Sequence, residues 1–148
     1  MVYTSDYPII SLTVDVALVS ATGRVLLVER GQDPYAGLLA LPGGFVDVDE
    51  DLETSARREL REETGLRVEA PLEQLGAYGR PDRDPRGRTV SVVFWAQLDD
   101  EPDAVGGDDA AAAHWFALTG ADGVLADPDR LAFDHAEVLR AVASRTGA

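Results

Sequence analysis

The stretch between Asp49 and Gly65 restricts the fold of this chain more than any other part of its sequence. Within it, Leu52, Ala56 and Leu60 recur at every fourth position, which aligns them as one apolar stripe on an α-helix. Asp49 is a suitable residue to cap the start of such a helix, and Gly65 suits the position just past its end. We therefore expect an amphipathic helix of about four turns that packs its stripe against the core.

Short apolar segments before and after this helix predict β-strands. In residues 12–19, apolar residues occupy every second position. Residues 25–28 are all apolar, as in a strand covered on both faces. Asp134, with Glu137 three residues later, predicts the start of a second helix through a capping-box-like pattern. Residues 31–44 and 101–112 are expected to form loops. We expect strands at residues 12–19, 25–28, 72–78, 90–98 and 113–118.

The number of strands relative to helices indicates the fold class. Strands that outnumber two helices favour a mixed sheet with helices packed on its faces. The chain has 148 residues, enough for one domain with its own core, and no internal repeat or long linker divides it. We therefore expect a single α/β or α+β domain that spans residues 1–148.

Composition limits the partners that the chain can bind. Its formal net charge is −14, which disfavours a nucleic-acid backbone as partner because binding that polyanion requires Lys and Arg. The sequence contains no apolar run long enough to cross a membrane, no cysteine, and no secretory pattern in the segment up to Ile10. We therefore expect a cytoplasmic protein that binds a small molecule rather than a nucleic acid or a membrane.

Three glutamates share one face of the predicted helix. Glu59, Glu62 and Glu63 are separated by three and four positions, so their carboxylates lie within a single turn. Like charges this close destabilise a helix unless a cation lies among them, and clustered carboxylates are ligands of hard divalent cations. Glu50 lies earlier in the chain and approaches the same region if the preceding loop folds back. Three glutamates considered alone are more simply explained as a solvated helix face.

The residues around these glutamates follow a wider pattern. From Gly44 the order is Gly, five residues, Glu50, seven residues, Arg-Glu-Leu-Arg-Glu-Glu at positions 58–63, and then Thr-Gly-Leu. This order resembles the Nudix box at every defining position, and the resemblance extends more loosely over most of the chain. It implies the Nudix fold, a mixed β-sheet between α-helices. It also implies a hydrolase that splits a nucleoside diphosphate linked to a further group.

The resemblance also implies roles for individual residues. Arg58 would orient a glutamate by ion pairing and support catalysis by the three helix glutamates. A divalent cation would neutralise the pyrophosphate and lower the pKa of the water that attacks phosphorus. Glu62 or Glu63 would take the proton of that water, and the alternatives left open are Glu101, Asp103, Asp108 and Asp109. The ligands implied for Mg²⁺ or Mn²⁺ are the carbonyl of Gly44 and the carboxylates of Glu50, Glu59, Glu62 and Glu63.

An arginine-rich stretch at residues 79–88 is the strongest candidate for substrate binding. It holds four arginines and two aspartates, a net charge of +2, whereas residues 44–66 hold eight acids and three arginines, a net charge of −5. A positive loop can guide an anionic ligand through a negative field, although its arginines can equally satisfy neighbouring carboxylates. Asp15, within an apolar strand, is a candidate for a ribose hydroxyl or base amine, and Arg30 for a phosphate. The four arginines of the stretch are Arg80, Arg83, Arg86 and Arg88.

Three segments resemble the bacterial ADP-ribose pyrophosphatase-like group of Nudix proteins. They are Arg-Asp-Pro-Arg-Gly-Arg at 83–88, Ala-His-Trp-Phe at 113–116 and Leu-Ala-Phe-Asp-His at 131–135. The resemblance implies ADP-ribose as substrate, cleaved to AMP and ribose 5-phosphate, and a homodimer. Two alternatives are a nucleoside triphosphate pyrophosphatase that removes damaged nucleotides and a non-catalytic ADP-ribose-sensing module. The intact box and the few residues after the last helix favour hydrolysis over sensing alone.

Overall fold

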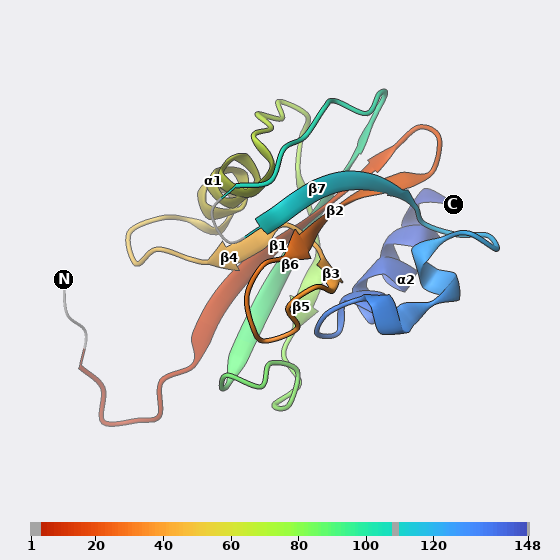
Figure 1. The fold of residues 1–148 in the computed structure, drawn as a ribbon. Coiled ribbons are helices and arrows are strands. Elements are labelled where there is room, and N and C mark those ends of the chain that lie inside the picture. Colours follow the sequence, from red (N-terminus) through yellow and green to blue (C-terminus); the bar gives the residue numbers. More distant parts are fainter. Residues whose placement is uncertain (1–3, 108–109, 148) are drawn as a thin grey trace.

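The computed structural model describes residues 4–107 and 110–147. Figure 1 shows one twisted sheet with α1 on one side and α2 on the other. The elements are, in chain order, β1 (Ser11–Ser20), β2 (Arg24–Arg30), β3 (Leu39–Ala40), β4 (Gly43–Phe45), α1 (Leu52–Thr64), β5 (Glu73–Tyr78), β6 (Thr89–Leu98), β7 (Ala110–Ala117), the short 3₁₀ helices η1 (Val124–Ala126) and η2 (Pro128–Arg130), and α2 (His135–Thr146).

The sheet is mixed, as the sequence predicts. Its strand order is β3-β2-β1-β6-β5, with β4 paired to β1 and β7 paired to β2. The pair β1 and β6 is parallel, in register from Ser11 opposite Thr89 to Ser20 opposite Leu98. The other strand pairs are antiparallel. The expected fold, a mixed β-sheet between helices, is therefore confirmed.

Strand β2 shows why the core has two layers. Leu26 and Val28 pack with Leu60 of α1 in one apolar cluster, whereas Val25 and Leu27 pack with α2 in a second. Successive side chains of a strand point to opposite faces, so a continuous apolar run can serve both clusters. The predicted coverage of this strand on both faces is confirmed.

Helix α1 begins two residues later than the Asp49 cap predicts. Asp51 is the N-cap residue, and its Oδ1 accepts a hydrogen bond from the Thr54 N–H at 2.8 Å. Both aspartates are suitable cap residues, and only the local backbone decides which one faces the free N–H groups. Gly65 ends the helix in the left-handed conformation, with φ 74°, as predicted.

Two other boundaries differ from the sequence prediction. The loop expected over residues 31–44 includes β3 and the start of β4, and the loop expected over 101–112 ends where β7 begins at Ala110. Ala112 and Ala113 pair with Glu29 and Val28 of β2. An alanine run carries little strand signal of its own, so the backbone pairing with β2 determines this part of β7. No helix in the described part of the chain has both the length and the apolar character needed to span a membrane.

Helix α2 begins at His135, with Asp134 at the N-cap position, as predicted, but without the predicted capping bond. The side chain of Asp134 makes no hydrogen bond to the helix N-terminus. Its carboxylate instead accepts two bonds from Arg83, from Nε at 3.0 Å and from Nη2 at 2.7 Å. The ion pair with a guanidinium from the arginine-rich stretch has replaced the local cap.

Candidate active site

A cavity of about 320 Å³ lies between β1, β4, α1 and the segment that enters α2. It brings together residues that are far apart in the sequence. Glu50, Glu62, Arg80 and Arg88 do not line it. The predicted site residues that do line it are Asp15, Arg30, Gly44, Arg58, Glu59, Glu63, Arg83 and Arg86.

The two glycines of β4 lie directly against the predicted metal-binding acids. A Cβ atom at Gly44 would lie 2.5 Å from the carboxyl carbon of Glu59, and one at Gly43 would collide with Asp15. The backbone N–H of Gly43 acts to lower the pKa of the Glu63 carboxyl. A larger residue at Gly43 would force the backbones of β4 and β1 apart, and one at Gly44 would displace the Glu59 carboxyl, so the observed arrangement requires glycine at both positions.

Arg58 contacts three glutamates with one guanidinium, two of them on α1 and one just before it. Its Nε lies 2.9 Å from Glu50 Oε1, and its Nη1 lies 2.8 Å from Glu59 Oε1 and 3.2 Å from Glu62 Oε2. Its Nη2 donates to the carbonyl of Phe45 at 3.1 Å, which ties α1 to β4. Arg58 therefore pairs with all three glutamates, and its role in orienting one of them for catalysis stays a prediction.

Glu63 is held in a different environment from the acids that contact Arg58. Burial raises the pKa of Glu63 to about 8, together with the negative charges of Glu59 and Asp15, while the Gly43 N–H and Arg30 act in the opposite direction. Glu63 takes part in none of the ion pairs among residues 4–107 and 110–147. A half-buried carboxyl beside other carboxylates is stabilised in its charged form by a cation.

The donor set of this cavity fits a hard divalent cation. Glu59, Glu63 and the backbone of Gly44 offer only oxygen ligands, the type that Mg²⁺ and Mn²⁺ prefer. Among the described residues, no three acidic or histidine side chains already converge as a metal-binding group. Glu59 and Glu62 contact Arg58 instead, so cation binding would require these side chains to turn away from the guanidinium.

The cavity floor contains a buried polar network that reaches from β1 to α2. The Ser91 hydroxyl donates a short hydrogen bond to Asp15 Oδ2, and His135 Nε2 lies 3.8 Å from the same oxygen. Burial acts to raise the pKa of Asp15, but His135, Ser91 and the more distant Arg83 outweigh it and hold the pKa below its usual value. Asp15 is therefore a charged group that faces the cavity and also belongs to an internal network.

The arginine-rich stretch is largely neutralised by its own neighbours. The side chains of Arg83 and Asp134 form an ion pair at 2.7 Å and are 3% and 4% exposed. Arg86 Nη2 lies 2.8 Å from Asp84 Oδ2, and Arg80 Nη1 lies 3.4 Å from Glu137 Oε2.

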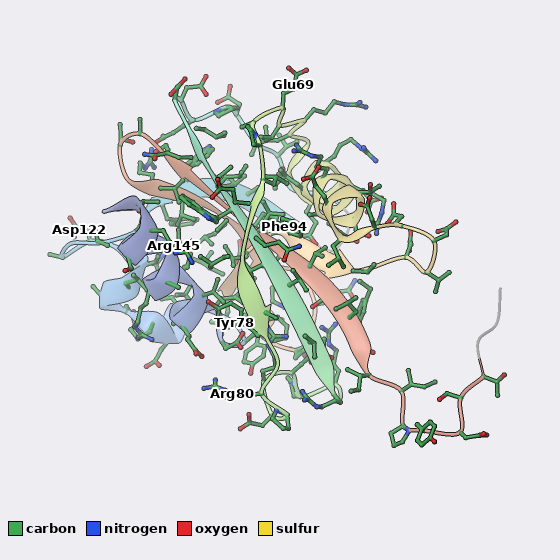
Figure 2. The ribbon with its side chains drawn as sticks, turned by 180° about the vertical axis from the view of Figure 1, so that it is seen from behind. Glu69, Tyr78, Arg80, Phe94, Asp122 and Arg145 are labelled. Carbon is green, nitrogen blue, oxygen red and sulfur yellow. The ribbon has the colours of Figure 1, made fainter. Side chains whose placement is uncertain are left out.

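The cavity reaches only part of this stretch. Arg88 donates to the Gly79 carbonyl, and Figure 2 shows Arg80 beside Tyr78, away from α1. Of the four arginines, only Arg83 and Arg86 line the cavity. Substrate binding by all four stays a prediction.

The alternatives for the general base differ in position. Glu101 accepts hydrogen bonds from Ser20, Thr22 and Arg24 at the turn between β1 and β2, outside the cavity. Asp103 is exposed and does not line the cavity. Asp108 and Asp109 lie outside the described residues.

Phe133 and His135 are among the cavity residues that were not predicted as site residues. Phe133 has a left-handed backbone with φ 52°, and its ring lies 5.0 Å from the Arg30 guanidinium and 5.6 Å from that of Arg86. His135 lies two residues further on and forms the floor. Both belong to the Leu-Ala-Phe-Asp-His segment, whose resemblance to a Nudix subgroup was the available signal. A left-handed non-glycine residue at such a place is typical of functional sites.

Comparison with known proteins shows the family of this chain. The NUDIX domain model matches residues 10–142. The chain is 38% identical over 128 residues to an ADP-ribose pyrophosphatase of Methanocaldococcus jannaschii, covering 83% of this chain and 68% of that protein. The chain therefore belongs to the Nudix family, and its class is that of the Nudix hydrolases, as its sequence predicts.

Three further matches are a transcriptional regulator and two solved structures. An ADPR-responsive transcriptional repressor, NtrR of Acinetobacter baylyi, is 36% identical over 95% of this chain, which spans only 56% of the repressor. The NUDIX domain of Shewanella oneidensis NrtR, complexed with ADP ribose, is 33% identical with a TM-score of 0.80 and coverage of 94% and 90%. A bifunctional NMN adenylyltransferase/ADP ribose pyrophosphatase of Francisella tularensis, complexed with AMP and a Mn ion, is 28% identical with a TM-score of 0.84 and coverage of 96% and 43%.

Proposed function

We propose that this chain hydrolyses the pyrophosphate bond of ADP-ribose and releases AMP and ribose 5-phosphate. The observation that carries the proposal is one cavity with two chemically different parts. Gly44, Glu59 and Glu63 form a carboxylate-rich part, while Arg30 and Arg86 bring guanidinium groups and stand close to Phe133. The pyrophosphatase relative and the two complexes described above support ADP-ribose as the ligand.

The residues of the carboxylate-rich part have roles that follow from their positions. Glu63, the Gly44 carbonyl and Glu59, once it turns away from Arg58, would hold Mg²⁺ or Mn²⁺. Glu50 and Glu62 would join them only after leaving Arg58 as well. When bound, the cation neutralises the pyrophosphate and lowers the pKa of the attacking water. Of the two predicted bases, Glu63 lines the cavity and is our proposal for the group that takes the proton of that water, whereas Glu62 would do so only after leaving Arg58.

The other part of the cavity supplies groups that bind the remaining features of ADP-ribose. Arg86 and Arg30 present guanidinium groups, which bind phosphate oxygens through charge-assisted hydrogen bonds. Asp15 presents a charged carboxylate that accepts hydrogen bonds from hydroxyl or amino groups. Phe133 presents a ring beside both arginines, suitable for packing against a base. Each of these contacts is a proposal that substitution can test.

A substrate panel tests the proposed reaction. The protein is incubated with Mg²⁺ or Mn²⁺ and with ADP-ribose, nucleotide sugars, dinucleoside polyphosphates and nucleoside triphosphates, and the products are identified. We expect AMP and ribose 5-phosphate from ADP-ribose, with no turnover in the presence of a chelator. Turnover of nucleoside triphosphates with no reaction of ADP-ribose would instead support the nucleotide-sanitising alternative.

Sensing of ADP-ribose is a second candidate function because a repressor is among the relatives. Calorimetric binding of ADP-ribose to the wild-type protein without product formation, in the presence of either cation, would favour it over hydrolysis. Four further features stay predictions: the preference for Mg²⁺, the cytoplasmic location, the homodimer, and the single domain over residues 1–148.

A further inference from the structure

The segment that enters α2 is joined to the chain just ahead of the two β4 glycines. Leu131 bridges to Leu39, and the N–H of Ala132 donates to the Leu39 carbonyl at 2.8 Å. The N–H of Leu41 donates to His135 Nδ1 at 3.0 Å. Leu41 and His135 are each 2% exposed, so this N–H has no access to solvent as an alternative partner.

This hydrogen bond determines the form of the imidazole ring. A backbone N–H can only donate, so the Nδ1 atom that receives it carries no proton. The neutral ring therefore carries its hydrogen on Nε2, the nitrogen that faces Asp15 Oδ2 at 3.8 Å. His135 is held between a backbone donor on one side and a carboxylate on the other, which fixes both its tautomer and its orientation.

The backbone that His135 holds leads directly to the acids of the cavity. Leu41 is followed by Pro42, whose carbonyl accepts a hydrogen bond from the Val16 N–H at 2.9 Å, and then by Gly43, which lines the cavity together with Glu63. Gly44, which follows, contacts the Glu59 carboxyl. A displacement at Leu41 would move both glycines relative to the two glutamates that line the cavity.

We infer that His135 is a positioning residue: by accepting the Leu41 N–H, it sets the place of Gly43 and Gly44 against Glu59 and Glu63. Only the expected effect on kcat rests on the proposed function; the effect on the backbone of Gly43 and Gly44 does not. An apolar side chain of similar size would fill the same space but leave the buried Leu41 N–H without a partner. The role therefore depends on the acceptor atom at the Nδ1 position and not on packing alone.

Two substitutions at His135 test the role of the acceptor atom, because they place an amide oxygen at different distances from the backbone. His135→Asn brings a carbonyl oxygen near the position of Nδ1, whereas His135→Gln carries it further, toward the position of Nε2. His114→Asn is the control, because His114 is the other histidine of the chain and is exposed on β7. Circular dichroism and thermal unfolding establish that all three variants are folded.

The first readout is independent of turnover. With only two histidines, ¹⁵N NMR resolves the ring nitrogens, and we expect an N–N coupling through the hydrogen bond between the Leu41 amide and His135 Nδ1. Amide hydrogen exchange at Leu41, Gly43 and Gly44 should accelerate in His135→Gln and return to the wild-type rate in His135→Asn. A missing coupling, or equal exchange rates in the two variants, would overturn the inference even if ADP-ribose is not the substrate.

The second readout is the kinetics of ADP-ribose hydrolysis. We expect kcat to fall by about ten- to a hundredfold in His135→Gln, since small misplacements of reacting groups have effects of this size, with a much smaller change in KM. His135→Asn should restore most of kcat, and His114→Asn should match the wild type. Equal kcat in His135→Gln and the wild type would contradict the positioning role. If no member of the substrate panel is turned over by the wild type, the proposed function fails, and the exchange and coupling measurements still decide the role of His135.

Discussion

The arginine-rich stretch at residues 79–88 and the glutamate face of α1 both concentrate charges of one sign, and the fold balances them differently. In the stretch, Arg80, Arg83 and Arg86 each have a separate carboxylate partner. On α1, the guanidinium of Arg58 contacts the carboxylates of Glu50, Glu59 and Glu62 together. Glu63 forms no ion pair within the described ranges, and its pKa is raised to about 8.

This difference separates structural charge from functional charge. Where an arginine has its own partner on α2 or at its N-cap, as Arg80 and Arg83 do, the ion pair holds the loop to the helix and leaves little free energy for a ligand. Where negative charge exceeds the nearby positive charge inside a cavity, a cation from solution can supply the missing interaction. A local charge excess in a cavity is therefore a better guide to the site than the total number of charges.

The largest expected effect is on stability, at the buried pair of the arginine-rich stretch. Arg83→Leu leaves Asp134 charged and unpaired in the interior, so the free energy of unfolding should fall by roughly 3–5 kcal/mol. Urea unfolding measures the change. Combining Arg83→Leu with Asp134→Leu should recover much of the loss, and Arg88→Leu should change stability by less than about 0.5 kcal/mol. Equal stability of Arg83→Leu and the wild type would mean that this pair is not structural.

The next largest effect is on catalysis, at Glu63, which forms no ion pair within the described residues. Glu63→Gln keeps the size of the side chain but removes its charge, so kcat for ADP-ribose should fall at least about a hundredfold. Glu53→Gln is the matched control, because Glu53 is an exposed glutamate of the same helix that pairs with Arg57. Steady-state kinetics at saturating Mg²⁺ measures both variants. Similar activities of the two variants would refute the assignment of Glu63.

A smaller effect, on KM for ADP-ribose, should distinguish the arginines of the stretch from one another. Arg86 lines the cavity, so Arg86→Ala should raise KM for ADP-ribose by about tenfold, as expected when one charge-assisted contact is lost. Arg80→Ala and Arg88→Ala remove side chains that do not line the cavity, so they should change KM by less than about twofold. Equal effects of the three substitutions, in the same kinetic assay, would show that the whole stretch contacts the substrate.

The last effect, at most about 1.4 kcal/mol for each unit of pH, is the pH dependence of stability in the presence of a chelator. The pKa of Glu63 is about 8 in the folded protein, against an ordinary value of 4.5. The folded state therefore binds more protons than the unfolded state between these values, and the free energy of unfolding should decrease as pH rises through this range. Urea unfolding at several pH values measures this slope. Glu63→Gln, or saturating Mg²⁺ with the wild type, should flatten it; a slope that neither changes would exclude Glu63 as its source.

Local spacing predicted the parts of the site that lie within one helix. The i, i+3 and i+4 positions of Glu59, Glu62 and Glu63 place them on one face, and the stripe of Leu52, Ala56 and Leu60 faces the core as predicted. Periodicity of this kind is a property of a few consecutive residues and does not depend on the rest of the chain. The end of α1 at Gly65 was predictable for the same reason.

Spacing could not predict which of these acids reach the cavity. Glu59 and Glu63 line it and Glu62 does not, although Glu59 and Glu62 both contact Arg58. The packing of β4 against α1 therefore decides which acids reach the cavity, and the charge pattern of the helix does not. The missed start of β7 at Ala110 has a related cause, because pairing with β2 selects a strand for an alanine run that has little strand signal of its own. The cap predicted at Asp49 differs, since the local backbone chooses between two suitable aspartates and places Asp51 against the Thr54 N–H.

The sequence by itself determined the elements, the family pattern and the carboxylates suited to a divalent cation. The tertiary structure decided the partners: Arg83 with Asp134, His135 with Leu41, and Arg86 beside Phe133. These pairs join residues up to 94 positions apart. Contacts over such separations depend on how sheet and helices pack as a whole, and short-range periodicity carries no information about them.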